Sequence, residues 1–397
     1  MDVSLLHPNE LDGAVLGAWR RMRAADARYA SPFLSPEFTL AVGAVRDDAR
    51  VLVVRGVDGA VDMVLPLQVV GTGLARPLGA PMNDVNGPVC SMRGLDAGLA
   101  DVLADAGVAA YVFSGWSDAH QGGSTGAKLR TREGSAVADL SHGFARYLDA
   151  QRDCHPRHFK KMRRLARQGE SLFGRMDVTL GPASPEELAT LIGWKREQFI
   201  RTRRHDVLGP EWTRGLLEQC AGARVPAFAG VMACLRFDGK LAAAEFGLRS
   251  GRVLHGWIAG YDAKFGAVSP GLILQERLLE PAAEMGVTEA VLGTGESHYK
   301  KYYASFMTPV DEGMVNATGF AGDLRGLSSS LMGALEAGGL GPASKLAGRT
   351  RRRLDVILAV ETRMGDQMRG LFRAIGEEPA LAGAGTLIRA GARAGAY

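Results

Sequence analysis

Acidic, phenolic and basic side chains gather within one short run, Glu296 to Lys301, which reads Glu-Ser-His-Tyr-Lys-Lys. A tyrosine hydroxyl can protonate a leaving group, and lysine ammonium groups can bind a phosphate or a carboxylate. The same run could form a surface loop in which only the tyrosine ring is packed. We rank this cluster first among the candidate sites, with Tyr299, Lys300 and Glu296 as catalytic candidates and Lys301 as a binding residue.

Two further carboxylates are candidate acid–base groups. Glu245 lies in the apolar run Ala-Ala-Ala-Glu-Phe, where burial would raise its pKa towards neutrality and suit it to act as a base. It could equally face solvent from the other side of the strand. Asp262 could act in the same way or could cap a turn. His255 and His298 complete the set, although His255 between Leu254 and Gly256 is more typical of a core histidine.

The elements that would position these groups follow one another between Gly230 and Ser305. Three β-rich runs, the first two joined by the hairpin turn Asp238-Gly239-Lys240, precede a helix that begins near Ser269 and ends near Gly286. We place the strands at Val231–Phe237, Leu241–Leu248 and Arg252–Tyr261, and a fourth at Glu289–Leu292 after the helix. An antiparallel meander followed by a β-α-β step is what an acyl-coenzyme A transferase core requires.

The strand-to-helix turn carries Ser269, Pro270 and Gly271. The first backbone N–H groups of a helix are free, and together with the helix dipole they favour an anion such as a pyrophosphate. Glycine would let the phosphate approach the backbone, and proline at the helix start removes no needed donor. An ordinary capped helix is the alternative interpretation.

The first half of the chain repeats this order of elements weakly. We expect helices at Glu10–Asp26 and Leu95–Ala106, and strands at Arg50–Val54, Asp62–Val70 and Ala109–Phe113. A strand–Asp-Gly–strand hairpin at Asp58-Gly59 matches the one at Asp238-Gly239. Two tandem copies of one domain would explain the shared order.

Between the halves, Ala145–Glu170 is predicted to be one basic helix, either a solvated connector or a wall beside an anionic ligand. Pro185–Arg204 is predicted to be the first helix of the second half, with a capping box made by Ser184 and Glu187. Its Trp194 and Lys195, together with Trp257, could line a cleft in which aromatic rings stack on sugars; core packing is the alternative.

The end of the chain is Ala- and Gly-rich apart from one helix. Gly319–Gly341 is predicted to be a linker, Pro342–Ile375 a helix and Glu377–Tyr397 a mobile tail. The helix contains Arg349, Arg352, Arg353 and Asp355, which could clamp a phosphate or a cyclic dinucleotide, touch an anionic membrane, or simply be solvated. The domain boundaries that follow are 1–144, 145–170, 171–317 and 318–397.

Composition narrows the class of protein. In 397 residues, 46% are hydrophobic and 23% are charged, and the formal net charge is +4, which alone does not indicate nucleic acid. The four cysteines are widely spaced, so neither a zinc site nor a disulfide framework is indicated. No signal peptide and no apolar run of membrane-spanning length is seen, so a cytoplasmic location is expected, with peripheral contact to the inner membrane left open.

With these motifs in view, the chain resembles the acetyltransferases linked to cellulose and exopolysaccharide synthesis (the CelD/BcsL type), which belong to the GNAT superfamily and are related to FemAB-like tandem transferases. The resemblance covers roughly Leu5 to Val315. Six motifs carry it in order: Ser31-Pro-Phe-Leu-Ser-Pro-Glu-Phe38, Val64-Leu-Pro-Leu67, Asp84-Val-Asn-Gly-Pro88, Gly260-Tyr-Asp262, Ser269-Pro-Gly271 and Tyr299-Lys300. Val291 stands where the family usually has Asp, and Glu296 replaces an Asp.

The resemblance implies an α/β (α+β) fold of tandem GNAT-like domains, each with a mixed, mostly antiparallel sheet flanked by helices, plus a C-terminal helical extension. It implies an acetyl-CoA-dependent N-acetyltransferase that modifies an amino sugar or a hydroxyl of a polysaccharide precursor. Coenzyme binding falls on Ser269, Pro270, Gly271, Leu272 and Ile273, with Gly271, Leu272 and Ile273 as N–H donors. No metal and no DNA partner are expected. A FemAB-like enzyme that uses aminoacyl-tRNA and a degenerate binding module regulated through the C-terminal arginines are the alternatives.

Overall fold

The computed structural model describes residues 1–71, 73–92, 94, 98–117, 127–295, 298–319 and 342–377, and the side chains of 342–350 and 373–377 are not described. The predicted linker at Gly319–Gly341 lies outside these residues except for Gly319, and the predicted mobile tail lies outside them beyond Glu377.

Two copies of the same strand order build one sheet. The first copy contains β1 (Asp2–Leu6), β2 (Ala49–Arg55), β3 (Val61–Val70), β4 (Leu74–Pro77) and β6 (Ala110–Ser117). The second contains β8 (Met176–Gly181), β10 (Phe228–Phe237), β11 (Lys240–Ser250), β12 (Val253–Tyr261) and β13 (Glu289–Thr294). In each copy the strands are antiparallel neighbours except the last two, β4 with β6 and β12 with β13, which are parallel. The repeated order confirms the predicted tandem arrangement.

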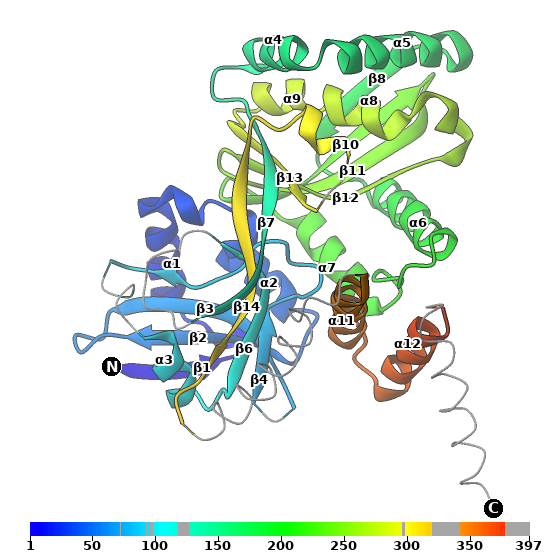
Figure 1. Cartoon of the computed structure of the whole chain (residues 1–397). Helices are drawn as coiled ribbons and strands as arrows, with labels where there is room; N and C mark the ends of the chain where they lie inside the picture. Colours follow the sequence, from blue (N-terminus) through cyan, green and yellow to red (C-terminus); the bar gives the residue numbers. More distant parts are fainter. Residues whose placement is uncertain are drawn as a thin grey trace, which may run out of the picture.

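The two copies exchange a strand where they meet. β7 (Lys128–Asp139) follows β6 in the chain but pairs with β13 of the second copy, whereas β14 (Phe306–Asn316) pairs with β6 of the first. β7 and β14 also pair with each other, so the described strands form one continuous 14-stranded sheet (Figure 1). The short strands β5 (Val89–Cys90) and β9 (Arg224–Val225) pair at its margins with β3 and β10.

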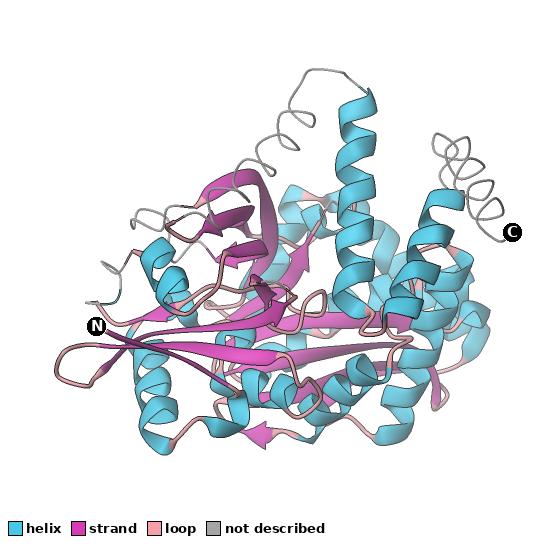
Figure 2. Cartoon of the chain, turned by 90° about the horizontal axis from the view of Figure 1, so that it is seen from below, coloured by secondary structure: helices cyan, strands magenta, loops and turns pink. Residues whose placement is uncertain are grey.

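Helices cover both faces of the sheet (Figure 2). In the second copy, one face packs on α6 (Pro185–Arg201) and α7 (Glu211–Gly222), and the other on α5 (Pro156–Phe173), α8 (Pro270–Arg277) and α9 (Leu279–Glu284). In the first copy, α1 (Gly13–Ala25), α2 (Pro36–Gly43) and α3 (Leu99–Asp105) contribute to the cores. Ser184 and Glu187 form the predicted capping box at the start of α6.

Three predicted helices are each divided in two. The basic helix predicted at Ala145–Glu170 consists of α4 (Phe144–Cys154) and α5, because a residue before proline avoids the helical region and His155 precedes Pro156. The helix after Ser269 divides into α8 and α9 near Leu278, since Pro281 has no N–H to donate back along the chain.

The third division is imposed by tertiary contacts. The C-terminal helix is α11 (Pro342–Val360) followed by α12 (Met364–Glu377). The Trp212 indole donates to the Val360 carbonyl oxygen at 2.8 Å, and His205 lies 3.0 Å from the Glu361 carboxylate. These contacts from α7 and the preceding loop fix the chain where α11 ends, and nothing in the local sequence indicates them.

Gly169 on α5 tests how tightly the helix layer fits the sheet. A Cβ added there would lie 2.6 Å from Cζ of the buried Phe237 ring on β10. Gly169→Val is therefore expected to reduce the free energy of unfolding by about 1–3 kcal/mol through overpacking. Urea unfolding would measure this. Gly193→Ala on α6, where an added Cβ meets nothing within 4 Å, is the control and should be neutral or slightly stabilising. An unchanged midpoint for Gly169→Val would contradict the packing argument.

Candidate functional site

A cavity opens where β12 and β13 separate. The two parallel strands pair only from Val253 to His255 of β12, so in the described part of the chain the rest of that edge of β12 has no neighbouring strand. The cavity of about 340 Å³ lies there, with α6 on one side and the start of α8 on the other. Among the residues that line it are six from the predicted site: Glu245, Lys195, Tyr299, Ser269, Gly271 and Leu272.

Glu245 lies on β11 opposite Ala259 and lines this cavity. Gly256 on β12 makes room for the carboxylate, because a Cβ at that position would lie 2.0 Å from Glu245 Oε1. Burial raises the pKa of Glu245 to about 7, although Lys300 and Lys195 act in the opposite direction. A carboxyl group with this pKa can both accept and release a proton near neutral pH.

Lys195 and Tyr299 flank Glu245 in the cavity wall. Lys195 Nζ donates to the Ala259 carbonyl oxygen at 3.2 Å, and burial lowers its pKa. Burial, and next the Glu245 carboxylate, raise the pKa of Tyr299 to about 12. Tyr299 is therefore protonated at neutral pH and available as a proton donor.

Lys300 connects Glu245 to a residue of the first copy. Its ammonium group donates to the Thr294 carbonyl oxygen, and burial lowers its pKa while Asp84 and Glu245 raise it. Asp84 Oδ2 lies 3.1 Å from Nε2 of His255, a side chain that is 1% exposed. Opposite charges thus act on one another at the junction: Asp84 on Lys300, and Glu245 on both Lys300 and Lys195. The sequence analysis used Asp84 only as part of a motif and did not assign it to the site.

At the bend before α8, only one of the three backbone N–H groups predicted to bind the coenzyme is free of hydrogen bonds among the described residues. Ser269 adopts a left-handed conformation (φ 53°), and its carbonyl oxygen accepts from the N–H groups of Leu272 at 3.0 Å and Ile273 at 3.3 Å. These two amides are therefore engaged, and the prediction that they are free donors was wrong. The Gly271 N–H makes no hydrogen bond among the described residues. A Cβ on Gly271 would meet only Tyr261 Cδ1, at 3.7 Å, so the bend has room for a close anion.

Other predicted site residues lie outside the lining of this cavity, among them Lys300, Pro270 and Ile273. Asp262 accepts from the Lys264 N–H at 2.9 Å and caps a short 3-10 helix, and Lys301 is exposed with Nζ 5.1 Å from the Tyr302 ring. The Trp257 indole donates to the Met82 carbonyl oxygen at 2.8 Å, and Trp194 packs against the adjacent core. Glu296 is outside the described residues.

A second cavity, of about 610 Å³, shares Leu272 and Tyr299 with the first. Arg157 and Lys161 at the start of α5 line it, as do three histidines: His155, His158 and His298. The His158 ring stacks on Tyr302 with centroids 4.0 Å apart, and burial lowers its pKa to about 4, so this histidine is neutral at pH 7. The two cavities therefore meet at Tyr299, and the second has a basic wall.

The predicted arginine array on α11 does not converge. Asp355 pairs with Arg351 at 3.1 Å and not with Arg352, which is exposed. Arg353 donates to the Arg203 carbonyl oxygen at 3.3 Å, and the Arg349 side chain is outside the described part.

Within the described residues, no group of three or more His, Cys, Asp or Glu side chains is arranged to hold a metal ion. No described helix has the length and apolarity needed to cross a membrane.

The strand order of the second copy, with its cavity beside two separating parallel strands, is that of a GNAT domain, and the first copy repeats the strand order. Residues 156–301 match the family model described as "Acetyltransferase (GNAT) domain", so the matched segment runs from the start of α5 to Lys301 and includes the cavity. None of the curated protein sequences matches the chain.

Solved structures of similar fold have low sequence identity to this chain. L-PGS from Bacillus licheniformis is 13% identical with a TM-score of 0.46, covering 84% of this chain and 96% of that one. FemX is 11% identical with a TM-score of 0.45, covering 70% and 90%. A tandem GNAT protein from the clavulanic acid biosynthesis pathway is 13% identical with a TM-score of 0.44, covering 80% and 100%.

The raised pKa of Glu245 predicts a pH-dependent cost to stability. Between about pH 4.5 and 7 the folded state holds a proton that the unfolded chain releases, so this group lowers the free energy of unfolding as pH rises through that window. The cost is absent below the unfolded pKa and complete above the folded one. Glu245→Gln should therefore be more stable than the wild type at pH 8, by about 3 kcal/mol at most, and equal to it at pH 4. Chemical unfolding at both pH values measures the difference, and a pH-independent difference would contradict the assignment.

Proposed function

We propose that the chain transfers an acetyl group from acetyl-CoA to the amine of an amino sugar, or to a sugar hydroxyl, on a precursor of an exopolysaccharide or cell-envelope polysaccharide. The observation that carries the proposal is Glu245, a carboxylate with a pKa of about 7 in a cavity beside Tyr299 and the start of α8. A base with this pKa suits removal of a proton from an amine acceptor.

The residues of the cavity divide the reaction between them. The Gly271 amide at the start of α8 would bind the coenzyme pyrophosphate, and the unpaired edge of β12 would offer backbone N–H groups to the thioester carbonyl oxygen. The acceptor nitrogen attacks the carbonyl carbon and gives its proton to Glu245. The carbon–sulfur bond then breaks, and the thiolate takes a proton from Tyr299. No covalent enzyme intermediate is needed.

The lysines of the site would place the acceptor. Lys195 and Lys300 both act on the charge of the Glu245 carboxylate and both are partly desolvated, so each can bind an anionic or hydroxyl group strongly. Asp84 is assigned a positioning role, because it lies beside Lys300 and holds His255 from the other copy.

A transfer assay tests this function. Purified protein would be incubated with acetyl-CoA and a panel of amino sugars and sugar nucleotides, and products would be identified by mass. We expect one acceptor to gain an acetyl group with release of one free thiol. Absence of transfer to every acceptor, together with no thermal stabilisation by acetyl-CoA, would reject the proposal.

A second candidate changes the donor to an aminoacyl-tRNA. Six cations on α5 face solvent and make no ion pair or hydrogen bond among the described residues: Arg157, Lys160, Lys161, Arg163, Arg164 and Arg167. This face leads to the basic wall of the second cavity and suits a polyanion. Binding of charged tRNA that weakens steeply with salt, without stabilisation by acetyl-CoA, would favour this candidate over the first.

A further inference from the structure

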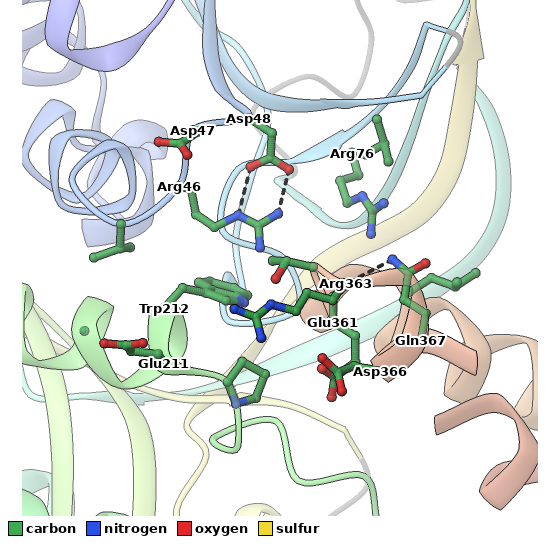
Figure 3. Close-up of a pocket in the computed structure, with 16 residues that line it drawn as sticks. Arg46, Asp47, Asp48, Arg76, Glu211, Trp212, Glu361, Arg363, Asp366 and Gln367 are labelled. Atoms are coloured by element: carbon green, nitrogen blue, oxygen red, sulfur yellow. Dashed lines mark hydrogen bonds and ion pairs between the residues drawn. The ribbon is translucent and has the colours of Figure 1, made fainter. Parts of the chain in front are cut away.

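A third cavity, of about 800 Å³, shares no lining residue with the two described above. Four segments form it: the turn before β2, the strand β4, the start of α7, and the turn between α11 and α12 (Figure 3). Trp212 lies between these segments, since its indole bonds Val360 and its ring lies 4.7 Å from the Arg46 guanidinium. No role in acyl transfer has been assigned to this region.

In the first copy, two arginines (Arg46 and Arg76) line this cavity, but only one inner carboxylate (Asp48) lies there to balance their charge. Arg46 donates to both oxygens of Asp48, at 2.8 and 2.6 Å, and Gln68 donates to the same oxygens at 3.0 and 3.1 Å. Asp48 is thereby occupied. Arg76 points into the same cavity and makes no hydrogen bond or ion pair among the described residues (Figure 3).

Both arginines are withdrawn from water. The Arg46 side chain is 9% exposed, and its buried Nη1 has no hydrogen-bond partner. Burial is the main cause that lowers the pKa of Arg76, and the carboxylates of Asp48 and Asp355 act in the opposite direction without a hydrogen bond or ion pair to it. A desolvated guanidinium without hydrogen bonds is unfavourable, so this wall gains stability from an anion that pairs with Arg76.

None of the acidic residues that line the cavity forms an ion pair with Arg76 in the described structure. Glu361 is paired with His205 and Asp366 with Arg369, so the carboxylates of the α11–α12 turn are engaged. Asp47 and Glu211 are exposed at the rim. Arg363 is also exposed, and it lines the same cavity from the turn after α11 (Figure 3). Among the described residues, the cavity therefore has a guanidinium group inside that makes no hydrogen bond or ion pair, and two carboxylates at its mouth that make no ion pair.

We propose that this cavity binds a small molecule with a phosphate group at one end and an amine at the other. The phosphate lies between Arg76 and Arg363, and the amine lies towards Asp47 and Glu211. The rim carboxylates would repel an extended polyanion, so the ligand carries one compact anionic group. An amino-sugar phosphate has this chemistry and fits a volume in the range of small-molecule sites.

Such a ligand would join the first copy to the C-terminal helices. Arg76 belongs to β4 and Arg363 to the turn after α11, so a phosphate held by both links two parts of the chain. Bound ligand should therefore slow amide exchange in α12. This binding is separate from acyl transfer and can be measured without it.

Isothermal titration calorimetry on the full chain tests the proposal with four probes: glucosamine 6-phosphate, glucose 6-phosphate, inorganic phosphate and glucosamine. We expect glucosamine 6-phosphate to bind most tightly and glucosamine not at all. Arg76→Gln and Arg363→Gln should each weaken glucosamine 6-phosphate binding at least tenfold. Arg352→Gln, which removes an exposed arginine of α11 outside this cavity, should leave it unchanged.

A second pair of variants tests the rim. Asp47→Asn and Glu211→Gln should reduce the preference for glucosamine 6-phosphate over glucose 6-phosphate, and should leave glucose 6-phosphate binding intact. Thermal unfolding confirms that each variant is folded. The proposal is overturned if no phosphate-bearing probe binds, or if glucosamine 6-phosphate binding survives unchanged in Arg76→Gln or in Arg363→Gln.

Discussion

Glu245→Gln is expected to lower kcat/KM for acetyl transfer by about two to four orders of magnitude, the range typical of a lost general base. The amide has nearly the same shape as the carboxylate, so it fills the space left by Gly256 but cannot accept the acceptor's proton. In the wild type, kcat/KM should rise with pH to a plateau with an apparent pKa near 7, because Glu245 must be deprotonated to act as the base. The residual activity of the variant should lack this rise.

The dependence of kcat/KM on pH distinguishes loss of the catalytic base from loss of folded protein. Glu289→Gln, an exposed carboxylate at the start of β13, is the matched control and should keep both the rate and the profile. Tyr299→Phe should lower kcat with little change in KM, since the hydroxyl is assigned to the leaving thiolate. If Glu245→Gln kept the same rise near pH 7, another group would be the base and the assignment would fail.

Gly271→Trp is expected to abolish coenzyme binding without unfolding the protein. A side chain at this position enters the cavity, where its Cβ would meet only the Tyr261 ring at 3.7 Å, and an indole there would occupy the space in front of the free Gly271 amide. We expect KM for acetyl-CoA to rise at least 100-fold, or stabilisation by acetyl-CoA to vanish. Titration of the coenzyme by calorimetry and by transfer rate measures both.

A glycine in open space elsewhere supplies the control for this variant. Gly222 at the end of α7 has nothing within 4 Å of an added Cβ and lines none of the three cavities described, so Gly222→Trp should bind acetyl-CoA normally. Equal coenzyme affinity in Gly271→Trp and wild type would mean that the bend at Ser269 does not hold the pyrophosphate.

Local patterns in the sequence predicted most elements of the second copy. The Asp238-Gly239 turn has both residues at positive φ (45° and 76°), as a tight hairpin requires, and the flanking apolar runs are β10 and β11. The order of these elements, repeated around Asp58-Gly59, also predicted the tandem fold. Strands such as β7 and β14 were not predicted, because their sequences are polar in part and their partners lie in the opposite copy.

The sequence was sufficient to nominate candidate site residues, but not to predict which of them lie together in one cavity. Glu245 was a candidate because a carboxylate in an apolar strand is unusual, yet only the separation of β12 from β13 decides that it faces a cavity and not solvent. From its residue type alone, Trp257 could have been a sugar-binding residue. In the structure its indole N–H instead donates a hydrogen bond to the Met82 carbonyl oxygen.

The sequence by itself determined the order of strands and helices, the turn chemistry and the residues able to move a proton, because these depend on neighbours a few positions away. The tertiary structure alone decided that Asp84 lies beside Lys300, that Ser269 engages the amides of Leu272 and Ile273, and that Arg76 makes no hydrogen bond or ion pair among the described residues. These outcomes depend on which distant groups share a buried space, and burial sets both the pKa of each group and the hydrogen bonds it can make.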